Sequence, residues 1–195
     1  MSLNARFGFA IVVGAIASAF AGISGGCAEP LDADRQTVVY SPDYAIYKEA
    51  VDPFLNRRCG TLDCHGQPGR ALRNYGTRGL REFVPDGGGM IPGREATTEE
   101  EKQLNYQSVV ALEPEMMARV VADGGNDPER LLLLQKALAK GCEGRNDFLC
   151  HKGGKVLAQG DSGYNCLTAW LKTRPGAKLT DFSAAQACKD AEAWK

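Results

Sequence analysis

The sequence has little that marks a common enzyme class or a nucleic-acid-binding protein. It contains only two histidines among 195 residues, and no Ser-His-Asp set, phosphate-binding P-loop or dinucleotide-binding glycine motif. Its 23 basic and 24 acidic side chains give a formal net charge of −1, whereas proteins that bind polyanions depend on clustered cations. No internal repeat or extended low-complexity tract is present. Neither those enzyme classes nor nucleic-acid binding therefore has support in the sequence.

Long hydrophobic runs are also missing, apart from one short run near the N-terminus. Arg6 precedes an almost uninterrupted apolar stretch at 7–20, and small residues follow as far as Gly26. The stretch is shorter than the roughly 18 to 20 residues that a membrane-spanning helix needs, and its flanks are typical of a secretory signal. The sequence therefore predicts an exported protein of the bacterial cell envelope.

Cys27 directly follows these small residues, where bacterial lipoprotein signals carry the cysteine that becomes acylated. Ser24 occupies the position three residues earlier where leucine is usual, so a plain signal peptide with Cys27 as an ordinary residue is the alternative. We expect residues 1–26 to be a lipoprotein-type signal peptide. Lipidation at Cys27 would anchor the protein to a membrane facing the periplasm or the exterior, with 27–42 as a tether and 43–195 as one domain.

The domain shows no convincing two-residue alternation, and helical periodicity recurs instead. Residues 66–96 are rich in Gly and Pro and predict a long irregular loop, which is uncommon unless something non-protein packs against it. The expected fold class is all-α. Helices are predicted from Tyr44 to Leu55 with a kink or new turn at Pro53, after a capping-box pattern at 97–100, and over 114–121. Three more are predicted from Asp127 as N-cap through Leu138, from near Asp161 or Ser162 to Pro175, and over about 181–194.

Seven cysteines are present, an odd number, and an oxidising compartment permits disulfides. A lipidated Cys27 would account for the odd one. If Cys59 and Cys64 hold a cofactor, two disulfides remain with three possible connectivities. Those four cysteines are Cys142, Cys150, Cys166 and Cys188. This partition is consistent with cofactor attachment but does not prove it.

The segment Cys59-Gly-Thr-Leu-Asp-Cys64-His65 is the candidate for chemistry. In c-type haem attachment two cysteines form thioethers with the haem, and the following histidine ligates iron; the usual spacing is C-x-x-C-H, two residues shorter than here. Three alternatives remain open. Cys59 and Cys64 could form a disulfide beside a surface His65, contribute to a zinc site, which usually has four ligands, or act as a redox dithiol, although C-x-x-C is normal for that role.

The surrounding motifs resemble those of cytochrome c-like domains of bacterial envelope proteins. An amphipathic helix ends at Arg58-Cys59, Cys64-His65-Gly66 follows, and then Arg70-Ala-Leu-Arg73 and Gly79-Leu-Arg81. A leucine-rich helix at 127–136, the H-x-G-G segment at 151–154 and a last helix with Trp170 are similar to the end of those domains. The resemblance covers about 43–172. The wider cysteine spacing, the inserted Cys142 and Cys150, and an extra C-terminal helix with Cys188 depart from it.

The resemblance implies a cytochrome c-like helical domain with covalent haem c on Cys59 and Cys64 and His65 as the proximal ligand. His151 is the expected distal ligand, because the glycines after it let backbone approach a flat macrocycle. A histidine that only hydrogen-bonds its own loop is the alternative. Met90, in a Gly-rich loop, is the other candidate for the distal position, whereas Met116 and Met117 are expected in the core.

An electron-transfer protein follows from this resemblance, not an enzyme, with an unknown redox partner protein. The alternative is a haem-free, disulfide-stabilised structural or binding lipoprotein that retains the scaffold; a haem peroxidase ranks last because no acid–base pair is recognisable.

A Cys142–Cys150 bridge would restrict His151, and a Cys166–Cys188 bridge would hold the last helix on the domain. Most of the arginines near the motif are expected on a solvated face, and one or two could pair with haem propionates; they are Arg57, Arg58, Arg70, Arg73, Arg78 and Arg81.

Overall fold

The computed structural model describes residues 39–84, 88–142 and 150–193. Residues 39–195 form one compact unit. The expected signal peptide, the lipidation at Cys27 and the tether up to residue 38 lie outside the described residues. Within the described ranges, no helix is long and apolar enough to cross a membrane.

The first helical segment confirms the predicted irregularity at Pro53. Helix α2 (Tyr44–Ile46) passes into a π-helical turn, η2 (Tyr47–Val51), and then into α3 (Asp52–Arg58). The Asp52 N–H bonds the Tyr47 carbonyl, five residues back. Since Pro53 has no N–H to donate, the regular ladder cannot continue through it, and a π-type turn absorbs the break. Helix α3 then ends at the cysteine motif.

Helices α4 (Glu99–Val110) and α5 (Pro114–Ala122) lie close to their predicted positions. The capping box at the start of α4 is one residue later than the sequence pattern suggested: Thr98 accepts from the Glu101 N–H, and the Glu101 side chain accepts from the Thr98 N–H. Local side-chain chemistry therefore fixes this helix start.

The predicted helix from Asp127 through Leu138 is wrong as one continuous element. A 3-10 turn, η3 (Pro128–Arg130), is separated from α6 (Leu132–Ala137) by an extended Leu131. Asp127 adopts a left-handed conformation with φ of 46° and makes no side-chain cap. Instead the carboxylate of Glu113 accepts from the Leu132 N–H, so a residue from the connection between α4 and α5 stabilises the start of α6.

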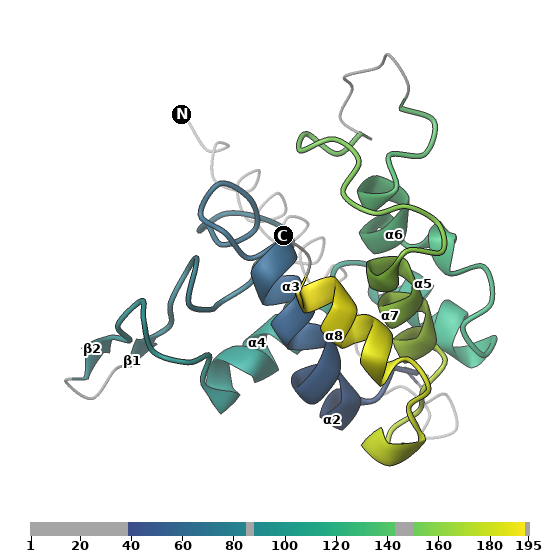
Figure 1. The fold of residues 1–195 in the computed structure, drawn as a ribbon, viewed down its shortest axis with the longest axis horizontal. Coiled ribbons are helices and arrows are strands. Elements are labelled where there is room, and N and C mark those ends of the chain that lie inside the picture. Colours follow the sequence, from purple (N-terminus) through teal and green to yellow (C-terminus); the bar gives the residue numbers. More distant parts are fainter. Residues whose placement is uncertain (1–38, 85–87, 143–149, 194–195) are drawn as a thin grey trace, which may run out of the picture. The chain divides into compact units, whose positions relative to one another are not determined.

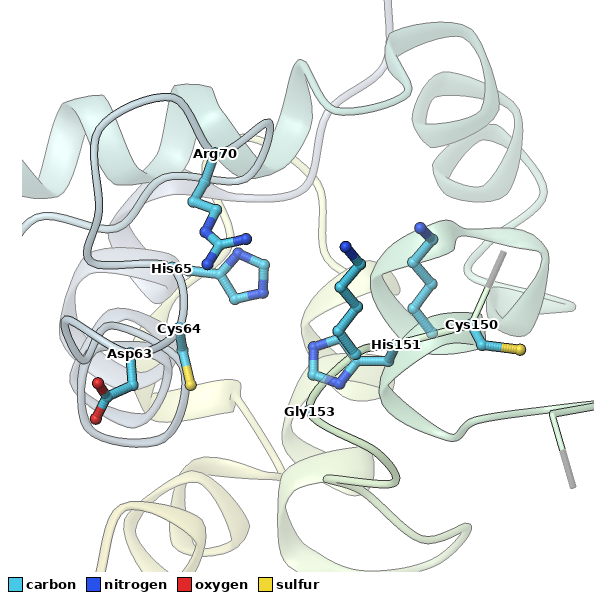
Figure 2. A pocket seen from close by; sticks show the side chains of 9 residues that line it. Asp63, Cys64, His65, Arg70, Cys150, His151 and Gly153 are labelled. Carbon is cyan, nitrogen blue, oxygen red and sulfur yellow. The ribbon is translucent and has the colours of Figure 1, made fainter. Parts of the chain in front are cut away.

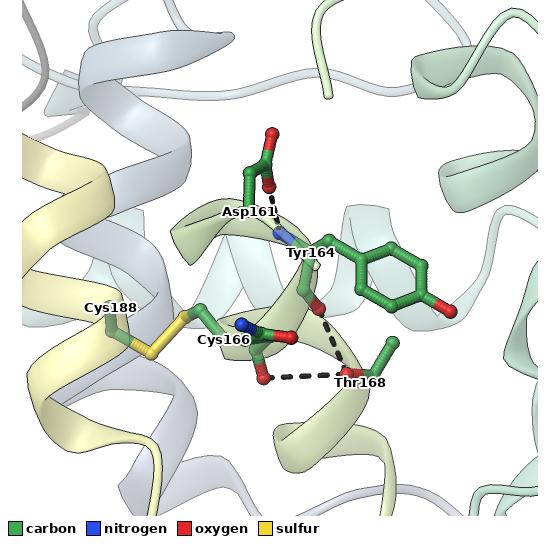
Figure 3. Close-up of a disulfide and its surroundings, with 6 residues drawn as sticks. Asp161, Tyr164, Cys166, Thr168 and Cys188 are labelled. Carbon is green, nitrogen blue, oxygen red and sulfur yellow. Dashed lines mark hydrogen bonds between the residues drawn. A yellow bond between two sulfur atoms is a disulfide. The ribbon is translucent and has the colours of Figure 1, made fainter. Parts of the chain in front are cut away.

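The C-terminal part contains α7 (Ser162–Leu171), a 3-10 turn η4 (Leu179–Asp181) and α8 (Ala185–Ala193). Asp161 caps α7 by accepting from the Tyr164 N–H at 2.7 Å, and the Cys166–Cys188 disulfide joins α7 to α8 (Figure 3). The last helix begins later than predicted. The Cys166–Cys188 bridge, one of the pairings that the sequence left open, is thus present between the last two helices.

The all-α prediction needs one correction, a small two-stranded sheet inside the predicted loop. Strand β1 (Phe83–Val84) pairs antiparallel with β2 (Gly89–Met90), with Phe83 opposite Met90. This hairpin projects away from the helices (Figure 1). Two-residue strands are too short to show alternation in a sequence. The protein is therefore mostly helical with a small two-stranded sheet.

The main core lies between α3, α7, α8 and the π-helical turn. Tyr47 and Trp170 are fully buried, with ring centroids 5.2 Å apart. The Trp170 indole donates to the Asp43 carbonyl at 2.9 Å, so its one polar atom is satisfied in the core. Helix α3 is packed on this core along its length, which fixes the position of the cysteine motif at its end.

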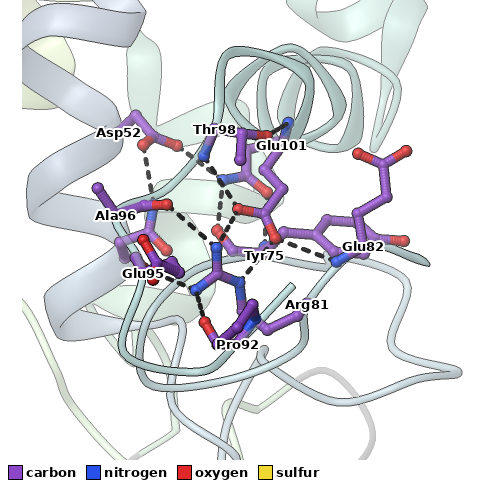
Figure 4. A network of polar contacts seen from close by, with 11 residues as sticks. Asp52, Tyr75, Arg81, Glu82, Pro92, Glu95, Ala96, Thr98 and Glu101 are labelled. Carbon is purple, nitrogen blue, oxygen red and sulfur yellow. Dashed lines mark hydrogen bonds and ion pairs between the residues drawn. The ribbon is translucent and has the colours of Figure 1, made fainter. Parts of the chain in front are cut away.

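A buried polar cluster anchors the irregular loop against α4 (Figure 4). Arg81 donates to both carboxylate oxygens of Glu101, at 2.8 and 2.9 Å, and to three loop carbonyls. Those carbonyls belong to Pro92, Glu95 and Ala96. All five guanidinium donors are thus used. The expectation of a solvated face is wrong for Arg81, which is 5% exposed.

Candidate functional site

The Cys59–His65 segment forms a compact turn at the end of α3. The His65 N–H donates to the Cys59 carbonyl at 2.8 Å, and the N–H groups of Cys64 and Gly66 both donate to the Thr61 carbonyl at 2.9 Å. The two residues beyond the usual spacing are accommodated in this turn. Its closure brings His65 back beside Cys59 despite the longer separation along the chain.

Three glycine backbones cross where this turn meets the following loop. A Cβ on Gly66 would lie 2.2 Å from the Gly60 carbonyl oxygen, and a Cβ on Gly79 would lie 2.0 Å from the same atom. Real side chains cannot occupy such positions, so only glycine permits this approach. The crossing holds the cysteine–histidine turn against the irregular loop.

A hydrogen bond to the backbone fixes which ring nitrogen of His65 faces the protein. Its Nδ1 lies 2.9 Å from the Leu72 carbonyl oxygen. A carbonyl only accepts, so Nδ1 carries the hydrogen and Nε2 keeps its lone pair. Burial lowers the pKa of His65 below its usual value of 6.5, while the hydrogen bond to Leu72 offsets part of this effect. The ring is therefore neutral at neutral pH and presents Nε2 as a ligand.

His151 is oriented in the same way on a different wall. Its Nδ1 lies 2.8 Å from the Gly154 carbonyl oxygen, so this hydrogen bond uses Nδ1 and Nε2 is the ring nitrogen left for a ligand. The loop after it is attached to α6, because the N–H groups of Val156 and Leu157 both donate to the Ala137 carbonyl. Immediately before it, Cys150 is bonded to Cys142. Of the three connectivities that the sequence left open, the structure therefore has the one with a bridge beside His151.

The structure brings the two histidines together across one pocket. Their ring centroids are 6.0 Å apart and their planes differ by 21°. Figure 2 shows the two near-parallel rings displaced from one another across the opening. The two expected ligands therefore lie at opposite sides of one small space.

This pocket combines an apolar wall with a few polar groups. A cavity of about 220 Å³ contacts Cys59, Cys64 and both histidines. Its apolar lining comes from the irregular loop, the end of α4, helix α6 and the segment after His151, and includes Leu72, Leu112, Leu132, Leu133, Ala137 and Val156. Arg58, Arg70 and Lys136 add positive charge at its boundary. The lining is suited to a flat apolar group with anionic substituents.

The two motif cysteines are free thiols, whereas the other four described cysteines form two disulfides. The Cys59–Cys64 disulfide alternative is therefore not the state of this structure. Burial raises the pKa of the Cys59 thiol to about 12, and the proximity of Cys64 contributes in the same direction. Cys59 is accordingly a protonated thiol at neutral pH, without the activation expected of a redox nucleophile.

Other expected candidates are not part of the site. Met90 lies on the projecting hairpin and is 64% exposed, so the structure does not bring it to the pocket. Met117 is buried in the core, as expected. Among residues 39–84, 88–142 and 150–193, no group of three or more His, Cys, Asp or Glu side chains is arranged to hold a metal ion. This finding argues against the zinc alternative.

Sequence reasoning missed the parts of the site that are backbone or apolar. The Leu72 and Gly154 carbonyls that orient the histidines carry no sequence signal. Leu132 and Leu133 belong to a leucine run that predicted only a helix, and Lys136 follows on the same helix.

Comparisons of the chain with protein-family models, curated proteins and solved structures find no match, so site geometry has to support any functional assignment.

Proposed function

We propose that the protein is a c-type haem-binding electron-transfer protein of the bacterial cell envelope. Cys59 and Cys64 would carry haem c through thioether bonds, and His65 and His151 would be the side chains that ligate its iron. The observation that carries the proposal is the placement of the His65 and His151 imidazoles at opposite sides of an apolar pocket.

The spacing of the rings fits one metal atom between them. Metal–imidazole bonds are about 2.0 to 2.1 Å long, so two such bonds in line, with the ring radii added, give centroids roughly 6 Å apart. The rings of His65 and His151 are 6.0 Å apart. Their hydrogen bonds to Leu72 and Gly154 match the usual second shell of ligating histidines, in which the other ring nitrogen donates to a carbonyl or carboxylate.

The ligand set favours a porphyrin over a bare ion. Only two side chains converge as metal ligands, and the described residues offer no third one. A porphyrin supplies four nitrogens itself and needs apolar walls, which Leu72, Leu132 and Leu133 provide. The free thiols of Cys59 and Cys64 contact the same cavity. When bound, haem would supply a one-electron redox couple.

The chain's own residues would hold this group and limit its chemistry. With His65 and His151 both as ligands, no position at the metal is left open for a substrate, which favours electron transfer over catalysis. The leucines would give the group an apolar surface to pack against. Arg70 and Lys136 are positioned at its boundary to balance anionic substituents, for which Arg is well suited.

The envelope location is supported by the N-terminal sequence. The apolar stretch at 7–20 and the small residues before Cys27 are typical of a lipoprotein-type export signal. We propose that Cys27 carries the lipid anchor and that the domain exchanges electrons with a redox partner protein at the membrane. Two disulfides in the domain agree with an oxidising compartment.

Covalent haem is the direct test. The full chain is produced in a bacterium with c-type haem maturation, and the purified protein is examined by absorption spectroscopy and by a denaturing gel stained for haem. We expect a stained band and a low-spin spectrum. The Cys59→Ala/Cys64→Ala variant is the matched control and should lose the stained band. A colourless wild-type protein that is folded would overturn the proposal.

A further inference from the structure

The two expected ligands differ in how firmly the protein holds them. His65 lies in the closed turn after α3, where its N–H donates to Cys59 and its carbonyl accepts from the Asn74 N–H at 2.9 Å. Its ring is fixed by Leu72. The two neighbouring cysteines would add thioether bonds. The backbone of His65, its ring and the neighbouring cysteines would therefore all fix its position.

His151 is held mainly by its own loop. Its ring bonds Gly154, and the Gly154 N–H in turn donates to the His151 carbonyl at 2.9 Å. Both bonds stay inside one short turn, so they move with the loop and do not fix it to the domain. The residues from Lys152 to Lys155 are exposed, which leaves this side of the pocket accessible to small solutes.

Two attachments to one end of α6 fix the position of this loop. On the C-terminal side of His151, Val156 and Leu157 bond the Ala137 carbonyl. On the N-terminal side, Cys150 is bonded to Cys142, which follows α6 closely. The disulfide is thus the covalent attachment nearest to His151, one residue away from it.

We propose that the Cys142–Cys150 disulfide is a positioning device for the metal ligand His151, and that His151 is the ligand that a small exogenous anion can displace. This inference rests on the proposed function. The disulfide keeps the His151 imidazole in the ligating position. It therefore controls how often His151 detaches and leaves its place at the metal open. Without the disulfide, the attachments left among the described residues lie on the C-terminal side of His151, at the Ala137 carbonyl and at the Val156 carbonyl that Arg58 contacts, and the His151 end of the loop can swing away from the pocket.

Cyanide binding to the oxidised, haem-loaded full chain tests the inference. Wild type is compared with Cys142→Ser/Cys150→Ser and with Cys166→Ser/Cys188→Ser, which removes the other disulfide, the one between α7 and α8. We expect cyanide association to be accelerated about tenfold or more in the first variant, equivalent to about 1.4 kcal/mol in the free energy of His151 detachment. The second variant should retain the wild-type rate, because a general loss of stability does not release His151.

A third variant, Gly153→Ala, keeps both disulfides. A Cβ on Gly153 would lie 3.0 Å from Cε1 of His151, so Gly153→Ala displaces the ring directly and should also accelerate cyanide association. Equal rates in wild type, Cys142→Ser/Cys150→Ser and Gly153→Ala, with all three proteins low-spin, would overturn the inference and leave the proposed function standing. Equal acceleration by loss of either disulfide would also overturn it. Wild-type protein without haem would overturn both proposals.

Discussion

His65 and His151 oppose one another across the pocket at 6.0 Å, with their planes within 21° of parallel. They belong to separate walls, one formed by the turn after α3 and the other by the loop after α6. Arg58 connects these walls, since its guanidinium donates to the Val156 carbonyl at 3.0 Å. The separation of the rings is therefore set by the packing of the domain and not by a local sequence element.

The identity of the distal ligand should control the reduction potential. Methionine in place of a second histidine raises the potential of a c-type haem. We expect His151→Met to have a higher midpoint potential than wild type in a spectroelectrochemical titration. Met90→Leu is the matched control and should leave the potential unchanged, because Met90 is exposed on the hairpin. A shift in the control variant alone would contradict the assignment of His151.

The Arg81–Glu101 pair should be essential for stability. Glu101 is fully buried, and Glu101→Gln leaves the Arg81 charge without its counterion. Breaking a buried pair in this way typically costs about 3 to 5 kcal/mol. Chemical denaturation should give a loss of that order in the free energy of unfolding. Glu99→Gln, which affects exposed pairs with Lys48 and Lys102, is the control and should have a much smaller effect; similar losses in both variants would argue against a special role for the buried pair.

Asp52 should produce a pH dependence of stability. Burial raises its pKa from 3.8 to about 6, although hydrogen bonds from Asn105 and Asn56 oppose the shift. The folded state therefore binds this proton more tightly than the unfolded state. The resulting contribution to stability is complete below about pH 4 and is lost as pH rises through about 6, with a total on the order of 3 kcal/mol.

The Asp52→Asn variant isolates this effect from other titrating groups. The difference in unfolding free energy between wild type and variant is measured by denaturation from pH 4 to pH 7. Wild type should lose stability relative to the variant as pH rises over this interval. A difference that is constant with pH would show that Asp52 titrates normally.

The glycine crossing beside the cysteine motif should tolerate no side chain. Gly66→Ala places a Cβ 2.2 Å from the Gly60 carbonyl oxygen, so the turn must open. We expect a lower thermal unfolding midpoint and reduced covalent haem incorporation. Gly93→Ala, in the same irregular loop but with open space around the new Cβ, is the control for a general effect of replacing glycine. Equal behaviour of the two variants would refute the steric account.

Local chemistry explains what the sequence could predict. The starts of α4 and α7 depend on side chains within three residues, at Thr98 and Asp161. Proline chemistry similarly made the break at Pro53 predictable. The break at Leu131 was not predictable, because the group that stabilises the start of α6 is the distant Glu113.

In the candidate site, too, local features were predictable from the sequence and contacts between distant residues were not. His65 and His151 were identifiable because the chain has only two histidines and one follows Cys64 directly. The burial of Arg81 and the leucine wall are tertiary effects. Arg81 is paired only because α4 brings Glu101 to the loop, and nothing near Arg81 in the sequence distinguishes it from the exposed arginines.

The measurement that tests the central claim most directly is low-temperature electron paramagnetic resonance of the oxidised, haem-loaded full chain. Two histidine ligands with nearly parallel rings, as in His65 and His151, predict a rhombic low-spin signal. His151→Ala should convert it to a high-spin signal. A high-spin signal in wild type, or a low-spin signal that persists unchanged in His151→Ala, would contradict the account.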